Sequence, residues 1–256
     1  MNEHKNYFIY AVVFLISLNI ISAQIPDKFT NLTLLPKEID KDHLIDVMKN
    51  FTSALGVRCN FCHAGKEGID DPKSLSDIDF ASDKIPAKDI TRVMMKMTHL
   101  INTDQLTQIK EKEHIDKINC VTCHKGMEHP PKPLEDILKR QAEKNGIEAA
   151  VKKYDELREK YYGGFVYDFT FNSLDAFTEN LIQSGKSSDV VAFFNAYLDK
   201  YDKNSWNAYF EIGKAYAGEK KYEEAKKNLD KALEISPDNG MVKWFYGRLK
   251  QEEGQN

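Results

Sequence analysis

The sequence predicts an all-α fold in two parts, and three observations support this prediction. Apolar residues recur at helical spacing along most of the chain. A group of prolines, Pro130, Pro131 and Pro133, interrupts the chain near its middle. A helical-repeat pattern with a period of about 34 residues begins at Trp206. The composition, 30% charged and 41% hydrophobic over 256 residues, is that of a globular protein with one large or two modest domains.

The N-terminal segment has the pattern of an export signal. Lys5 precedes an almost unbroken apolar run over residues 7–21, and the small residues Ser22 and Ala23 follow it. We expect residues 1–23 to be a signal peptide, which places the mature protein in the periplasm or otherwise outside the cytoplasm. The run is shorter than the roughly 20 residues of a membrane span, so we expect no stable span after cleavage. An uncleaved N-terminal anchor remains the alternative.

Two amphipathic helices are expected in the first part, residues 24–133. One covers residues 40–55, with Asp40 as N-cap and Gly56 as its end. The stretch 65–83 reads as loop because it is rich in Gly, Asp and Ser. The second helix begins near Pro86 and carries a stripe of Ile90, Met94, Met97 and Ile101. Each helix contains methionine and is followed by a Cys-x-x-Cys-His pentapeptide.

The second part, residues 134–256, is expected to be entirely helical. One or two charged helices over 134–162 end at Gly163 and Gly164, and residues 165–169 fit a packed connector better than a strand. A tetratricopeptide-like pattern then places large, small and terminating residues in register: Tyr209, Ile212, Gly213, Tyr216, Ala225, Leu229, Ala232 and Pro237. A single repeat cannot bury its apolar face alone, so the helices from about 134 onward must stack with it.

All four cysteines lie in the two pentapeptides, at 59–63 and 120–124. In this motif the thiols of Cys59 and Cys62, or of Cys120 and Cys123, add to the vinyl groups of a porphyrin, and the adjacent histidine ligates iron. The sequence therefore predicts two covalently attached haem c groups.

Three other uses of paired cysteines fit this sequence less well. Zinc ribbons typically separate their knuckles by about 15–20 residues, whereas 57 residues separate Cys62 from Cys120. A thioredoxin-like pair expects a βαβ context, which the sequence lacks. A structural disulfide between the two cysteines of a Cys-x-x-Cys segment is unusual, and here two such bonds would have to form.

Each iron needs two axial ligands, and His63 and His124 supply one apiece. A methionine or a histidine must supply the other. Met48 lies in the helix before the first motif, and Met94, Met95 and Met97 lie in the helix before the second. The histidines that compete for this role are His99, His114 and His129.

Residues 31–63, 92–102 and 121–126 together resemble the cytochrome subunit of photosynthetic reaction centres. That family carries four haems as two tandem halves, and this chain has the equivalent of one half over about residues 30–133. The resemblance implies Met48 and Met94 as the axial methionines, with Met97 at a packing position and Met95 off the stripe. One family haem takes a histidine from the other half, and the corresponding residue here is Gln108.

These features predict an exported electron carrier rather than an enzyme. The expected partners are redox proteins, docked through the helical repeats. A net charge of −4 gives no basic footprint for nucleic acid. Two alternatives stay open: a peroxidase-like di-haem enzyme with one open iron site, and an interaction scaffold in which the haems sense redox state.

Overall fold

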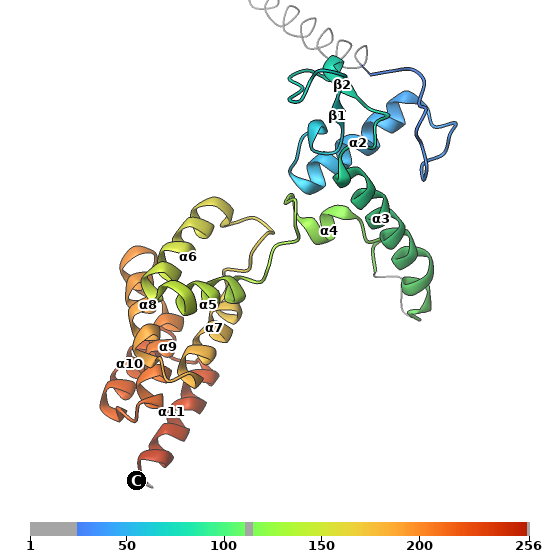
Figure 1. Ribbon diagram of the computed structural model, residues 1–256. Coiled ribbons are helices and arrows are strands. Elements are labelled where there is room, and N and C mark those ends of the chain that lie inside the picture. The colour runs from blue at the N-terminus through green and yellow to red at the C-terminus, as the bar shows by residue number, and fades with distance from the viewer. Residues whose placement is uncertain (1–24, 111–114, 255–256) are drawn as a thin grey trace, which may run out of the picture. The chain divides into compact units, whose positions relative to one another are not determined.

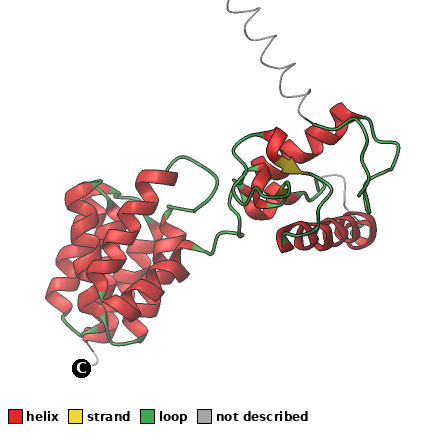
Figure 2. Ribbon diagram, turned by 45° about the horizontal axis from the view of Figure 1, so that its top comes forward, coloured by secondary structure: helices red, strands yellow, loops and turns green. Residues whose placement is uncertain are grey.

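The computed structural model describes residues 25–110 and 115–254 (Figure 1). The prediction of an all-α fold is confirmed, because helices dominate the described residues and the only strands among them are two residues long (Figure 2). The chain divides into two compact units, the first ending at Pro131 and the second beginning at Lys132. The predicted signal peptide, residues 1–23, lies outside the described residues. Among the described residues, no helix combines the length and apolarity that crossing a membrane requires.

The first unit begins with helix α2, Lys41–Leu55, whose two ends are those expected from the sequence. The carboxylate of Asp40 accepts a hydrogen bond from the backbone N–H of His43, which satisfies one of the free donors at the start of the helix. Gly56 ends the helix in the left-handed conformation, with φ of 65°. Glycine adopts this conformation without the steric cost that a Cβ imposes.

Short elements link α2 to the second long helix. A 3-10 turn, Cys59–Phe61, is followed by strand β1, Ala64–Gly65, which pairs antiparallel with β2, Ile78–Asp79; a second 3-10 turn, Leu75–Asp77, precedes β2. Helix α3, Pro86–Leu100, starts with proline in its first turn and continues through a π-helical turn, Ile101–Gln105, and a 3-10 turn, Leu106–Gln108. Helix α4, Cys120–His124, consists of the second pentapeptide itself.

The second unit is a stack of helices in which each packs on its neighbours. In chain order these are α5 (Leu134–Asn145), α6 (Ile147–Tyr161), α7 (Phe171–Gln183), α8 (Ser187–Lys200), α9 (Trp206–Gly218), α10 (Tyr222–Ile235) and α11 (Gly240–Glu253). Residues 165–169 form an irregular connector, as predicted, and no strand. Tyr154 contacts the rings of Phe169 and Phe193, which holds the end of this connector against the stack. Its first residue, Phe165, is 93% exposed, so the connector is packed only in part.

The two units differ in how they bury apolar side chains. In the described part of the first unit the buried apolar residues are Leu44, Ile45, Ala54, Ala64 and Ile78. Both hydrophobic clusters of the described chain lie in the second unit. One of them joins α5 to α9, and the other joins α9, α10 and α11. The second unit therefore has the extended core that stacked helical repeats require, and the first unit has little core of its own.

Within the second unit, helices α7 and α9 share a group of charged side chains, of which Glu211 and Lys214 on α9 are buried. Glu211 is 0% exposed. The Nζ of Lys214 lies 2.6 Å from Asp175 Oδ1, 2.6 Å from Glu179 Oε1 and 3.3 Å from Glu211 Oε2. Burial raises the pKa of Glu211 to about 8, although the nearby Lys214 acts to lower it.

The protonation of Glu211 makes the stability of the second unit depend on pH. The folded chain holds a proton on this carboxyl that the unfolded chain releases above its ordinary pKa of 4.5. The protonated carboxyl makes its full contribution to the stability below pH 4.5. This contribution is lost as the pH rises through about 8.

We therefore expect Glu211→Gln, which is neutral at every pH, to stabilise the chain relative to the wild type by an amount that grows as the pH rises from about 5 to about 8. The measurement is the thermal unfolding of both proteins across this range, followed by circular dichroism. A difference in melting temperature that stays constant with pH would contradict the assignment.

Candidate functional site: two Cys-x-x-Cys-His motifs and a cavity

The first motif follows directly from the end of α2. The N–H of Gly56 donates to the carbonyl of Thr52, and the chain then turns into the 3-10 turn at Cys59. The backbone N–H of His63 donates to the carbonyl of Cys59 at 3.0 Å. This turn gathers the two thiols and the imidazole of the motif within one short segment.

The ring of His63 is held in an apolar setting. Its edge-on neighbour is Phe80, with ring centroids 5.2 Å apart. Burial, with a smaller contribution from the charges of Lys88 and Arg92, lowers the pKa of His63, so the imidazole is neutral at physiological pH. Its Nδ1 is buried and has no hydrogen-bond partner among the described residues. The neutral imidazole is the form in which histidine ligates a metal.

A cavity of about 560 Å³ lies beside the first motif. Its lining includes Met48, Cys59, Cys62 and His63, together with apolar residues of α2 and of the segment before it. Its volume falls within the roughly 300–1,000 Å³ typical of small-molecule and cofactor sites. The thiols, imidazole, thioether and apolar walls are the donor set that a covalently attached haem needs, so these residues fit the cofactor that the motif predicts.

The second motif is a single helical segment with well-defined ends. Asn119 and Thr122 form a capping box at the start of α4, and Lys125 leaves the helix in the left-handed conformation. The imidazole of His124 is only 9% exposed. Its Nδ1 lies 3.0 Å from the carbonyl oxygen of Met127. Because a carbonyl only accepts, Nδ1 carries the proton and donates it, which leaves Nε2 as the atom that can bind iron.

Helix α3 presents opposite faces to two different environments. Lys88, Thr91, Arg92 and Met95 line the cavity beside the first motif. The opposite face carries four exposed apolar residues: Ile90, Val93, Met97 and Leu100. Contiguous exposed apolar residues of this kind mark a binding surface. The C-terminal end of α3 leads to the second motif, because Asn102 exchanges two hydrogen bonds with the backbone of Ile118, at 2.7 and 2.8 Å.

The predicted methionines differ in whether they line the cavity. Met48 lies in the cavity with the first motif, whereas Met94 does not line it. Met95, expected to lie off the functional stripe, lines the same cavity as Met48. The sequence pattern missed this role because it followed one apolar stripe, while Thr91 and Met95, four residues apart, already mark a second face.

The histidines that compete as iron ligands lie elsewhere. His99 and His129 are exposed and do not line the cavity. His114 lies outside the described residues. The four cysteines form no disulfide. Across residues 25–110 and 115–254 no three His, Cys, Asp or Glu side chains converge as a multidentate metal site, including a four-ligand zinc site, would require.

The two motifs are joined at one close backbone contact between α2 and α4. The N–H of Gly126 donates to the carbonyl of Ala54 at 2.9 Å. A Cβ on Gly56 would overlap the carbonyl oxygen of Gly126, so only glycine fits at the end of α2. Ala54 precedes the first motif by a few residues, and Gly126 follows the second by two. The contact therefore fixes the two motifs within the same small unit.

Fold and site together define a helical chain with two Cys-x-x-Cys-His motifs in one unit and a stack of helical repeats in the other. The comparisons with known families agree with this class. The family described as photosynthetic reaction centre cytochrome C subunit matches residues 73–188, and the tetratricopeptide repeat matches residues 206–239. The resemblance predicted from the sequence is thereby confirmed. No curated protein matches the chain.

The extent of the cytochrome match differs from the expected range of about 30–133. It includes Met94 and the second motif, but it begins after the first motif and continues through α5, α6 and α7 to residue 188, at the start of α8. The match indicates a haem-containing electron-transfer protein. The repeat indicates a surface for protein–protein interaction.

The contact between Gly56 and Gly126 can be tested by adding one methyl group. Gly68 is the matched control, because it also has a positive φ, of 82°, but an added Cβ there meets nothing within 4 Å. We expect Gly68→Ala to cost about 1–2 kcal/mol of stability from backbone strain alone. Gly56→Ala should cost more, because it adds a steric overlap to the same strain. Thermal or urea unfolding of both variants measures the difference, and equal losses would show that the contact is unimportant.

Proposed function

We propose that this protein is an exported electron carrier that holds two haem c groups in its first unit. The single observation that carries the proposal is the cavity that brings together Met48, Cys59, Cys62 and His63. Cys120, Cys123 and His124 form the second attachment site on α4. The proposed domains are residues 24–133 for the cofactors and 134–256 for the repeats, behind a signal peptide at 1–23.

The chain's own residues have distinct roles in this proposal. Cys59 and Cys62, and likewise Cys120 and Cys123, anchor the cofactors through thioether bonds, so that a unit with little core of its own retains them. His63 and His124 would each hold one iron through an imidazole nitrogen. Met48 and Met94 would each add a sulfur ligand, which is soft and favours the reduced metal. When bound, each haem carries one electron at a time.

The second unit is proposed to dock a redox partner. Stacked helical repeats form extended surfaces for binding other proteins. The tetratricopeptide match at 206–239 supports this role. If one histidine and one methionine held each iron, no position would stay open for a substrate, and the protein would act as a carrier and not as a peroxidase-like enzyme.

The axial assignment is tested by spectroscopy of the full chain produced in a host that matures c-type cytochromes. We expect two haems per chain and a fully low-spin resting spectrum. Met48→Ala and Met94→Ala should each convert one haem to a high-spin form, because each removes one axial sulfur. Met97→Ala, at an exposed position on the same helix as Met94, is the control and should leave the spectrum unchanged.

Two results would contradict the assignment. A high-spin signal in the wild type would favour the peroxidase-like alternative. If Met95→Ala converted one haem to a high-spin form and Met48→Ala did not, the sulfur ligand of the first haem would be Met95 and not Met48. Met95 lines the same cavity.

A further inference from the structure

The charged residues that line the cavity are strongly unbalanced in sign. Six basic residues contribute to its wall: Lys28, Lys49, Arg58, Lys66, Lys88 and Arg92. Among the described residues that line the cavity, Asp79 is the only acidic one. The chain as a whole has a formal net charge of −4, so the positive wall is a local feature of the fold.

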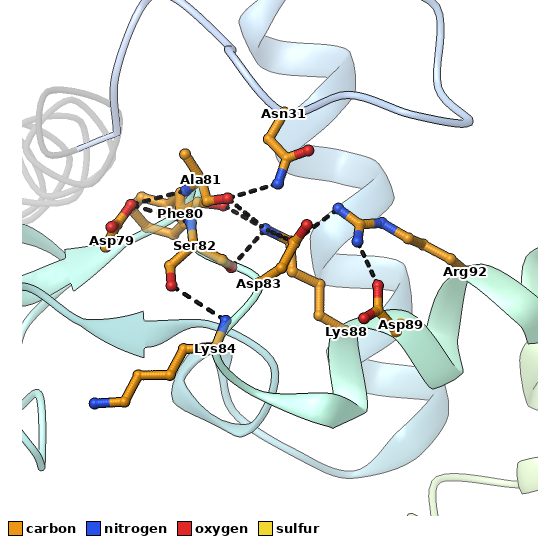
Figure 3. A network of polar contacts seen from close by, with 10 residues as sticks. All are labelled: Asn31, Asp79, Phe80, Ala81, Ser82, Asp83, Lys84, Lys88, Asp89 and Arg92. Atoms are coloured by element: carbon orange, nitrogen blue, oxygen red, sulfur yellow. Dashed lines mark hydrogen bonds and ion pairs between the residues drawn. The ribbon is translucent and has the colours of Figure 1, made fainter.

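Lys88 and Arg92 are the members of this wall that the structure holds most firmly (Figure 3). The Nζ of Lys88 donates to the carbonyl oxygens of Phe80, Ala81 and Ser82 at 3.0, 3.2 and 2.8 Å. Arg92 donates to Asp83 at 2.9 Å and to Asp89 at 2.5 Å. The Lys88 and Arg92 side chains are 12% and 17% exposed.

The carboxylates that neutralise these cations lie outside the cavity wall. Asp83 contacts both Lys88, at 3.1 Å, and Arg92, yet neither Asp83 nor Asp89 lines the cavity. Their side chains are 42% and 64% exposed. Hydrogen bonds from Arg92 and Lys88 hold the pKa of Asp83 well below its usual range, so it stays ionised. The ion pairs are thus oriented with their positive ends toward the cavity, and water screens the negative ends more strongly.

We propose that Lys88 and Arg92 raise the reduction potential of the group held by Cys59, Cys62 and His63, and that Asp83 moderates this effect. The inference rests on the proposed function. Reduction adds one electron and so lowers the charge of the site by one unit. A fixed positive potential at the cavity favours the reduced state, because it stabilises the less positive of the two charge states. Lys88 and Arg92 are therefore tuning and positioning residues, and do not ligate the metal.

An electrostatic role predicts the direction in which each substitution shifts the reduction potential, and a merely structural role predicts a different pattern of shifts. Arg92→Gln removes a positive charge from the cavity wall and should lower the potential. Asp83→Asn removes the negative end of the same ion pair and should raise it. If the pair served only to hold the loop 79–83 in place, both substitutions would loosen the site and would shift the potential in the same direction.

The experiment is a redox titration of the full chain with two haems, followed by absorbance. The transition of the first site is identified as the one missing from the Cys59→Ala/Cys62→Ala variant. We expect this transition to move to lower potential in Arg92→Gln and to higher potential in Asp83→Asn, while the other transition moves less. Arg92→Lys keeps the charge and should restore most of the wild-type value. Lys84→Gln is the matched control, because Lys84 is exposed and its side chain points away from the network in Figure 3.

The haem content of every variant is measured beside its potential. Two haems per chain with no shift, or with shifts of the same sign in Arg92→Gln and Asp83→Asn, would overturn the inference and leave the proposed function intact. A wild-type chain that binds no haem would overturn both.

Discussion

The hydrogen bond from Gly126 to the carbonyl of Ala54 is the contact on which the arrangement of the first unit depends. It joins the end of α2 to the residues that follow α4, and it requires glycine at position 56, where a Cβ would overlap the Gly126 carbonyl. Each partner lies within a few residues of a Cys-x-x-Cys-His motif. Two helices far apart in sequence are thereby held side by side, with one Cys-x-x-Cys-His motif at each.

Two features shape the rest of the first unit: this contact, and the small number of buried apolar side chains. Helix α3 lines the cavity with one face and exposes apolar residues on the other. Such surfaces are costly to leave in water, at about 25 cal/mol per Å² of apolar area. The second unit has its own clusters of buried side chains. The chain thus combines a unit with few buried apolar side chains, in which the proposed cofactors would supply additional apolar contact, with a self-sufficient helical stack.

Local sequence signals predicted the parts of this structure that depend on neighbouring residues. Asp40 and Gly56 marked both ends of α2, and the repeat pattern from Trp206 marked α9 and α10. Contacts between distant residues were not predictable in this way. Lys88 reaching back to the loop 79–83, and Glu211 buried against α7, depend on which helix faces come together. The role of Met95 was missed for a different reason, because the pattern followed a single apolar stripe of the helix, although Thr91 and Met95 mark a second face at a spacing of four residues.

The account rests on both pairs of thiols being consumed in bonds to porphyrin, and the most direct test is the mass of the intact, denatured chain. Protein matured in a competent host should exceed the polypeptide mass by two haem groups, and an alkylating reagent should label none of Cys59, Cys62, Cys120 and Cys123. A colourless chain of unmodified mass, with four reactive thiols, would contradict the account.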